Sequence, residues 1–298
     1  MGKLIRKSLL FILTGFIFLN VISRLIIDSK YFSKNISYNV SLMAVKKSKR
    51  KIASNVLILG DSVARQIFPV VMPNSLAVNG AILMAGHYIL AVNAIKKNPN
   101  IKYVILMSAP FILSHDFNRK LTYNNFLKPF YTFGNLKYLT SLMKKKINGN
   151  ILSHLALFPI FKLSPVPQID FSNKSSKKIS PVFSEISIQY MKKLYNFLKK
   201  RRIELLIISP PICKKQRVLF LNWKYFKSQI SERGLSHILR GYFDNIVYLD
   251  KGYFINDRIH LNVRYVRHSR EKLMRKLLPE RIIIQLEKDK ILPLKLYK

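Results

Sequence analysis

Short apolar runs alternate with amphipathic stretches along most of this chain. The apolar runs are bounded by charged residues, Gly or Pro, which is typical of buried strands; they cover residues 52–59, 75–78, 103–107, 204–209 and 246–249. The amphipathic stretches place apolar residues at helical spacing; they cover residues 86–97, 185–200, 216–239 and 262–278. This alternation predicts an α/β domain over residues 52–298, with a mostly parallel sheet in a three-layer α/β/α arrangement.

The alternation is lost between about residues 113 and 184. This segment is rich in Asn, Lys, aromatic residues and Pro, and it shows no clear period. A long irregular stretch within a regular α/β domain is usually a functional loop. We therefore predict an insertion that shapes a pocket of the domain, rather than a second domain.

The N-terminus carries an apolar stretch that is preceded by basic residues and contains one charged residue, Arg24. Its length is close to the roughly 20 residues that cross a bilayer, and an Arg near one end can reach the headgroups. A cleaved signal peptide normally has a shorter apolar core and a small-x-small cleavage site. Ser23-Arg24-Leu25 is no such site. The pattern predicts that residues 1–27 form an uncleaved membrane anchor, a transmembrane helix.

Residues 28–51 are polar and basic, and we interpret them as a juxtamembrane tether that lies on anionic headgroups. Basic residues flank the apolar stretch on both sides, so the positive-inside rule does not set its orientation. Long domains translocate largely regardless of their charge. We therefore expect the N-terminus in the cytoplasm and the bulk of this single-pass chain outside it.

The charge balance is strongly basic, with 52 Lys and Arg against 14 Asp and Glu and a net charge of +38. One interpretation is a polyanionic partner, such as nucleic acid, anionic lipid or an acidic envelope polymer. The other is compositional drift, because Lys is spread along the whole chain and Ile, Asn, Phe and Tyr are also plentiful. No recognisable nucleic-acid-binding motif is present. We expect membrane lipid, and not nucleic acid, as a partner.

Residues with the chemistry of nucleophilic catalysis follow the first and the last predicted strand. They are Gly60-Asp61-Ser62 in one place and Asp257 and His260 in the other. Because ligand sites in parallel sheets lie at the carboxyl ends of the strands, we expect these segments to meet. A serine hydroxyl needs a base that takes its proton, and the base needs an acid that orients it. The sequence thus predicts Ser62 as nucleophile, His260 as base and Asp257 as orienting acid.

Simpler interpretations of the same residues stay open. Ser62 could cap the following helix, and His260 could be an ordinary loop histidine. Asp61 is expected to brace its loop rather than to take part in chemistry.

These segments resemble the first and last sequence blocks of the SGNH/GDSL hydrolase family, Gly-Asp-Ser after a strand and D-x-x-H-L near the C-terminus. The resemblance implies a flavodoxin-like form of the three-layer fold. It also implies that the Ser62 N–H helps to form an oxyanion hole. The family's second block places an Asn shortly before an oxyanion-hole Gly, which points to Asn79 and to Gly86 or Gly80. Gly86 is preferred because it opens the following predicted helix.

The family's third block, G-x-N-D, has no counterpart here, and Ser108-Ala109-Pro110 stands where it should be. Asn79, Ser108 and Asn118 are the candidates that could replace its oxyanion Asn. Members of the family that are anchored in membranes move or remove O-acyl groups on envelope polymers. The resemblance therefore implies a serine esterase or O-acyltransferase of the bacterial inner membrane, acting on an acylated cell-surface glycan from the periplasmic or outer side.

Two other functions remain open. A catalytically degenerate relative would use the same fold to bind a glycan or a partner membrane acyltransferase, and the missing third block favours it. A membrane-tethered polyanion binder would explain the charge. We expect no cofactor and no metal, because there is no P-loop, no G-x-G-x-x-G, and no histidine spacing typical of a metal site. The single cysteine, Cys213, is expected to pack.

Overall fold

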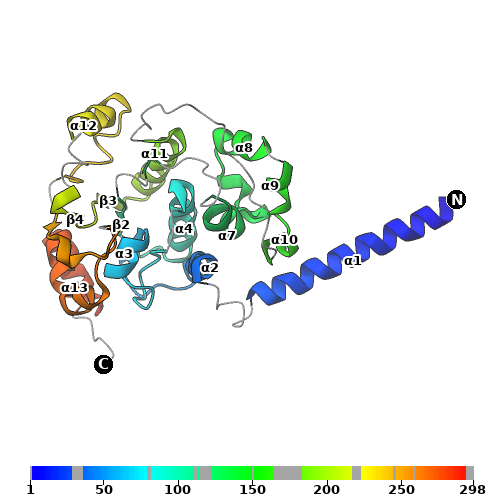
Figure 1. Cartoon of the computed structure of the whole chain (residues 1–298), viewed down its shortest axis with the longest axis horizontal. Helices are drawn as coiled ribbons and strands as arrows, with labels where there is room; N and C mark the ends of the chain where they lie inside the picture. Colours follow the sequence, from blue (N-terminus) through cyan, green and yellow to red (C-terminus); the bar gives the residue numbers. More distant parts are fainter. Residues whose placement is uncertain are drawn as a thin grey trace.

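The computed structural model describes residues 2–28, 36–78, 82–109, 113–114, 122–149, 151–163, 183–216, 223–243, 246–257 and 259–292. Within these residues the fold is α/β, with many helices around a small parallel sheet (Figure 1). The strands of this sheet pair in the order β1-β2-β3, and they cover Val56–Gly60, Tyr103–Met107 and Glu204–Ile208. The predicted strand at 103–107 is confirmed at both ends.

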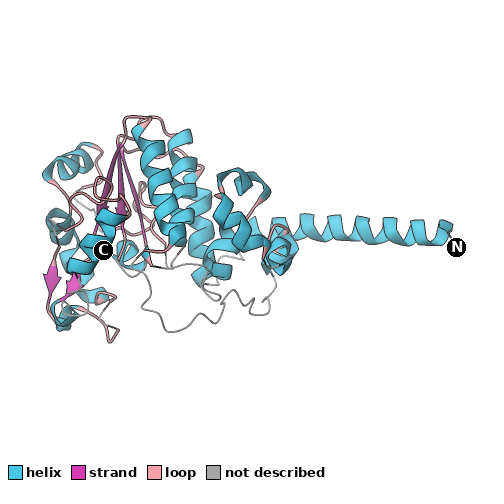
Figure 2. Ribbon diagram, turned by 90° about the horizontal axis from the view of Figure 1, so that it is seen from above, coloured by secondary structure: helices cyan, strands magenta, loops and turns pink. Residues whose placement is uncertain are grey.

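Helices cover both faces of this sheet (Figure 2). Successive side chains of a strand point to opposite faces, so Leu57 and Leu59 enter one hydrophobic core while Val56 and Ile58 enter the other. All four side chains are fully buried, which explains why these strands are continuous apolar runs. The first core is shared with α4 (Leu83–Lys97) and α11 (Glu185–Lys199). The second is shared with α3 (Ser62–Ile67), α13 (Val263–Leu277) and α14 (Glu280–Lys288).

The predicted strand at 75–78 is a single parallel bridge rather than a strand. Ser75 pairs with Ile58, and the N–H groups of Leu76 and Val78 donate to carbonyls of β1 at 2.8 and 3.1 Å. This segment therefore lies along the outer edge of β1. A second small parallel sheet pairs β4 (Ile212–Cys213) with β5 (Tyr248–Leu249), and Cys213 is buried, as expected.

Two helix predictions need correction. Part of the predicted helix at 216–239 lies outside the described residues, and its described part, α12 (Trp223–Glu232), ends well before residue 239. The chain leaves the helix at Gly234, whose φ of +63° suits glycine. The C-terminal helix is also followed by a second helix, α14, which the sequence pattern did not predict.

The juxtamembrane segment is not only a tether. Ile36–Ser48 form helix α2, and Val40, Ala44 and Val45 are buried in the first core. The ammonium group of Lys47 adds hydrogen bonds to the carbonyls of Val70 and Ser75, at 2.8 and 2.7 Å, and to that of Met72. Helix α2 is therefore part of the folded domain.

The described part of the predicted insertion is mostly helical. It contains η2 (Tyr123–Leu127), α7 (Lys128–Phe130), η3 (Phe133–Tyr138), α8 (Ser141–Asn148), α9 (Ile151–Leu155) and α10 (Pro159–Leu163). Phe126 and Phe130 stack on each other and are buried in the same core as α4 and α11. Short helices separated by Pro and Gly hide their periodicity from a sequence-level analysis.

Helix α1 (Gly2–Asp28) extends away from the rest of the protein in Figure 1. It is long and apolar enough to cross a membrane, a test that a signal sequence would also pass. Its C-terminal half contacts α10. Phe16 packs edge-on against Phe158, with ring centroids 5.3 Å apart, and the N–H of Ile160 donates to Asn20 Oδ1 at 3.3 Å.

Candidate functional site

Ser62 lies at a sharp turn between β1 and α3, and Gly60 makes this turn possible. A side chain at Gly60 would bring its Cβ to 2.6 Å from the Met107 carbonyl oxygen and to 2.3 Å from the Ala64 Cβ. Neither distance is compatible with a real Cβ, so only glycine fits between the two strand ends. The turn places Ser62 as the first residue of α3, at the carboxyl edge of the sheet.

Asp61 braces this turn, as the sequence analysis expected. Its Oδ1 accepts from the N–H groups of Val63 and Ala64 at 2.9 and 3.2 Å, which caps α3. Its Oδ2 accepts from the N–H of Ala109 at 3.3 Å and so ties the end of β1 to the end of β2. The side chain is buried, and desolvation raises the pKa of Asp61 although these backbone N–H groups oppose the shift.

Asp257 and His260 lie on a closed loop after β5. Asp257 Oδ1 accepts from the N–H groups of Ile259 and His260 at 2.8 and 2.9 Å, which folds the D-x-x-H segment into a tight turn. The ends of the loop are joined by an antiparallel bridge between Phe254 and Leu261, both of which are buried. The loop is thus anchored in the second core while its tip points outward.

The two segments meet in a chain of side-chain contacts. His260 Nε2 lies 2.7 Å from Ser62 Oγ, and His260 Nδ1 lies 2.5 Å from Asp257 Oδ2. The carboxylate can only accept, so the Nδ1 proton is directed to Asp257 and Nε2 accepts from the Ser62 hydroxyl. This tautomer is the one in which imidazole can take a proton from serine.

Asp257 is kept ionised by its surroundings. Burial by itself raises the pKa of Asp257, but hydrogen bonds from the His260 side chain and from the His260 and Ile259 amides outweigh it, and the pKa lies below its usual value. A carboxylate that is charged at neutral pH can stabilise an imidazolium on its neighbour. The site therefore has the electrostatics that a serine–histidine proton transfer requires.

Gln66 joins the two halves of the site, and it is a residue that the sequence analysis missed. Its side-chain Nε2 donates to the Leu261 carbonyl, and its Oε1 accepts from the Leu261 N–H, each at 2.9 Å. Arg270 of α13 donates to the Gln66 carbonyl at 3.3–3.4 Å. A glutamine within a short helix gives no sequence signal for such a role, because its partner lies almost 200 positions away.

The contact between Ser62 and His260 lies near the protein surface. The side chains of His260 and Asp257 are 34% and 38% exposed, and Ser62 is partly buried. A site this close to the surface suits a large substrate that stays mostly in solvent better than a small molecule that must be enclosed.

The two predicted oxyanion donors that the structure describes, the N–H groups of Ser62 and Gly86, differ in whether they already have a hydrogen-bond acceptor. The Ser62 N–H has no hydrogen-bond acceptor among the described residues, as expected at the first position of a helix. The Gly86 N–H instead lies inside α4 and donates to the Ile82 carbonyl at 3.2 Å. The lack of a side chain at Gly86 lets Phe130 approach, since a Cβ there would lie 3.1 Å from that ring.

Asn79, Gly80 and Asn118 lie outside the described residues. Ser108, the other candidate, follows β2, and its Oγ is buried without a partner among the described residues. Its carbonyl accepts from the buried hydroxyl of Tyr242 at 2.8 Å. The described residues contain no group of three His, Cys, Asp or Glu that could hold a metal ion.

Comparison with models of protein families gives no match, and comparison with curated protein sequences gives none either. The geometry of the site therefore carries the functional argument.

Proposed function

We propose that this chain is a serine esterase or O-acyltransferase of the SGNH/GDSL type. The observation that supports it is the chain of contacts from Ser62 Oγ to His260 Nε2, and from His260 Nδ1 to Asp257 Oδ2, at 2.7 and 2.5 Å. These contacts join residues that are 198 positions apart, and they have the order and the tautomer that nucleophilic catalysis needs.

In the proposed reaction, Ser62 Oγ attacks the carbonyl carbon of an O-acyl ester while His260 Nε2 takes the hydroxyl proton. The tetrahedral intermediate collapses, the C–O bond to the alcohol breaks, and His260 returns the proton to the leaving oxygen. The acyl group is then on Ser62. Water attacks it in an esterase, and a sugar hydroxyl attacks it in a transferase, with His260 again as base. Asp257 stabilises the imidazolium in both steps.

The Ser62 N–H is the proposed oxyanion donor. It lies on the nucleophile itself, and its hydrogen is not used elsewhere among the described residues. A preorganised backbone donor of this kind typically contributes about 10²–10³-fold in rate. The Ala109 amide, which stands in place of the missing third block, is not part of the proposal because it is committed to Asp61.

The proposed substrate is an acylated glycan of the bacterial cell surface. The exposed position of His260 suits a polymer, and helix α1 is able to hold the domain at the inner membrane with the domain on its outer side. A membrane acyltransferase is the candidate source of the acyl group if the chain acts as a transferase.

Labelling with a fluorophosphonate probe tests the nucleophile. The folded chain should be labelled at Ser62, labelling should be lost in Ser62→Ala, and it should be kept in Ser236→Ala, which removes an exposed serine on the surface. Hydrolysis of p-nitrophenyl acetate by the same three proteins tests turnover. No labelling of the wild-type chain, under conditions that label an active serine esterase, would refute the proposal.

The second candidate function is a catalytically degenerate relative that binds an acylated glycan or a partner acyltransferase. The observation that favours it is the Gly86 amide, which is occupied within α4 and cannot serve as an oxyanion donor. Under this alternative, Ser62→Ala leaves glycan acylation in cells unchanged, whereas under the first proposal it changes the amount of surface acetate.

A further inference from the structure

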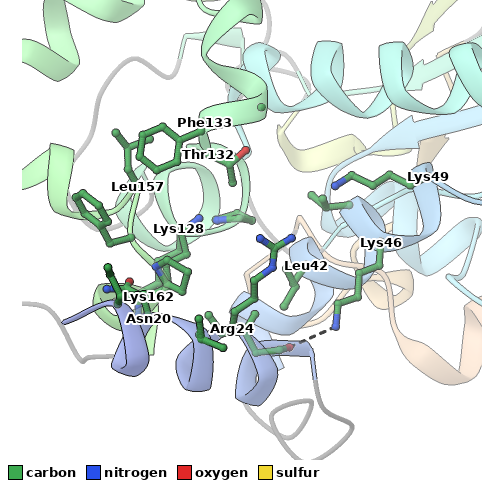
Figure 3. A pocket seen from close by; sticks show the side chains of 18 of the residues that line it. Asn20, Arg24, Leu42, Lys46, Lys49, Lys128, Thr132, Phe133, Leu157 and Lys162 are labelled. Carbon is green, nitrogen blue, oxygen red and sulfur yellow. Dashed lines mark hydrogen bonds between the residues drawn. The ribbon is translucent and has the colours of Figure 1, made fainter. Parts of the chain in front are cut away.

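A cavity of about 650 Å³ lies between α1, α2 and the helices of the insertion (Figure 3). Neither Ser62 nor His260 lines it, so it is separate from the site described above. Its walls come from three parts of the chain that are far apart in sequence. The cationic residues among the lining side chains are Arg24, Lys46, Lys49, Lys128 and Lys162.

None of the described residues that line the cavity is Asp or Glu. Figure 3 shows the side chains of Arg24, on α1, and Lys49, which directly follows α2, directed toward the same space. Lys46 instead reaches the Ile27 carbonyl at the end of α1, at 3.3 Å. Several like charges that share one cavity repel each other unless an anion enters.

Among these cations, Lys162 has the greatest need for an anionic partner. Its side chain is only 7% exposed, and its ammonium group donates to the Tyr131 carbonyl at 3.2 Å. Burial, together with the nearby Arg24 charge, lowers the pKa of Lys162 to about 8. A buried ammonium is costly unless it is paired. An anion bound between Lys162 and Arg24 would remove this cost.

The side of the cavity next to α1 is aromatic. Phe158 packs edge-on against both Phe16 of α1 and Phe133 of η3, with ring centroids 5.3 and 5.9 Å away. Phe133 is 63% exposed although it is a large apolar residue. The cavity therefore has an apolar aromatic side next to its cationic side.

The position of Arg24 on α1 places the cavity at the boundary between hydrocarbon and headgroups. Residues 2–14 of α1 are exposed, and the lining of the cavity begins at Phe16. A charged side chain is costly inside the hydrocarbon core, so a membrane-bound α1 would hold Arg24 at headgroup level. The exposed residues 2–14 span roughly 20 Å, so a core of about 30 Å that ends near Arg24 would also include the turns of α1 that contact Phe158 and Ile160.

We propose that this cavity binds the phosphate headgroup of an anionic phospholipid, with Arg24 and Lys162 as the principal ligands and the acyl chains lying along α1. Arg and Lys are the side chains that proteins use for phosphate. The cavity is large enough for a headgroup, and its aromatic side continues onto the exposed apolar surface of α1. This inference does not depend on the proposed activity at Ser62, but it requires that α1 stays attached to the domain.

Native mass spectrometry of the full chain, released from detergent with phosphatidylglycerol or phosphatidylcholine, tests the proposal. We expect one phosphatidylglycerol per chain and no retained phosphatidylcholine. Arg24→Gln together with Lys162→Gln should weaken phosphatidylglycerol binding on the order of 30-fold, from the usual contribution of two cations near an anionic surface. The matched control is Arg267→Gln with Lys272→Gln, which removes the same charge from exposed positions on α13.

The single variant Arg24→Gln separates loss of binding from loss of folding, because Arg24 is exposed and the buried Lys162 stays in place. It should weaken binding by itself. The proposal is overturned by equal phosphatidylglycerol binding in the cavity variants and in the control. It is also overturned if glycerol phosphate without acyl chains binds as tightly as the lipid, which would indicate a site for a free phosphate. An intact mass that lacks residues 2–28 would overturn it as well.

Discussion

The side-chain amide of Gln66 forms two hydrogen bonds with the backbone of Leu261, each 2.9 Å long. Gln66 lies on α3, which begins at Ser62, and Leu261 directly follows His260. These two bonds therefore join the helix that carries the hydroxyl to the loop that carries the imidazole, beside the contact between Ser62 and His260 themselves. Because the amide both donates and accepts, it fixes the orientation of the loop relative to α3 as well as the distance between them.

We expect Gln66→Ala to lower kcat of ester hydrolysis about tenfold or more with little change in KM, because a small displacement of His260 weakens proton transfer. The substitution also leaves the polar groups of Leu261 without their partner, which costs about 1–3 kcal/mol of the free energy of unfolding. Steady-state kinetics and urea unfolding measure the two effects. Gln229→Ala, which removes a half-buried glutamine whose side chain donates to Glu232 on α12, should change neither.

Asp257→Asn tests the orienting acid. An amide in place of the carboxylate cannot hold the Nδ1 proton or stabilise an imidazolium, so kcat should fall about 10³–10⁴-fold while the fold is kept. Asp250→Asn is the control, since Asp250 is an exposed carboxylate that is paired with Lys214. Equal rates for Asp257→Asn and Asp250→Asn would exclude Asp257 from the proposed mechanism.

Gly60→Ala should destabilise the protein strongly. The new methyl group would meet the Met107 carbonyl oxygen and the Ala64 side chain at distances that require the strand ends to move apart. Such overpacking typically costs about 1–3 kcal/mol, and Ser62 would move with the turn. Gly134→Ala is the matched control, because nothing lies within 4 Å of its added Cβ. The midpoint of urea unfolding should shift only for the first variant.

Binding of phosphatidylglycerol should weaken as the pH rises through about 8. The pKa of Lys162 is about 8 in the empty cavity, and a bound phosphodiester, which keeps its single charge, would raise it. Binding thus takes up a proton near this pH, and the affinity falls as the solution becomes more alkaline. Among the described residues, the other charged side chains that line the cavity are Arg24, Lys46, Lys49 and Lys128.

In Lys162→Arg, the same titration should be flatter over pH 7–9, because a guanidinium stays protonated throughout this range. Affinities measured at constant ionic strength separate this effect from salt screening. An identical pH dependence in the wild-type chain and in Lys162→Arg would show that Lys162 does not contact the headgroup.

The sequence predicted strand β2 correctly because both faces of this strand are buried, which restricts it to apolar residues. Residues 103–107 are a strand with both faces covered, so the run is apolar throughout and its ends are visible. The order of the motifs along the chain also pointed to the meeting of Ser62 with His260, because each follows a parallel strand, although β1 and β5 belong to separate sheets. The contact of 2.7 Å is what the location of the two motifs had implied.

Other features could not be predicted because they depend on partners far along the chain. Helix α2 contains polar and basic residues, and its helical form only becomes favourable once Val40 and Ala44 pack against α4. Gly86 matched a glycine expected from the resemblance, but the helix begins earlier, at Leu83, and its backbone uses the amide. The role of Gln66 depends on where Leu261 lies in space.

Helix α2 has one more consequence for the proposed enzyme if α1 holds it at a bilayer. Lys47 fastens this helix to the segment after α3, and Lys46 reaches back to the end of α1. The span between the lipid surface and the serine hydroxyl is consequently fixed by packed helices and has little slack. Such an enzyme would act at a fixed distance from the membrane surface. The glycan, and not the enzyme, would then have to bend or extend to bring its acyl groups to Ser62.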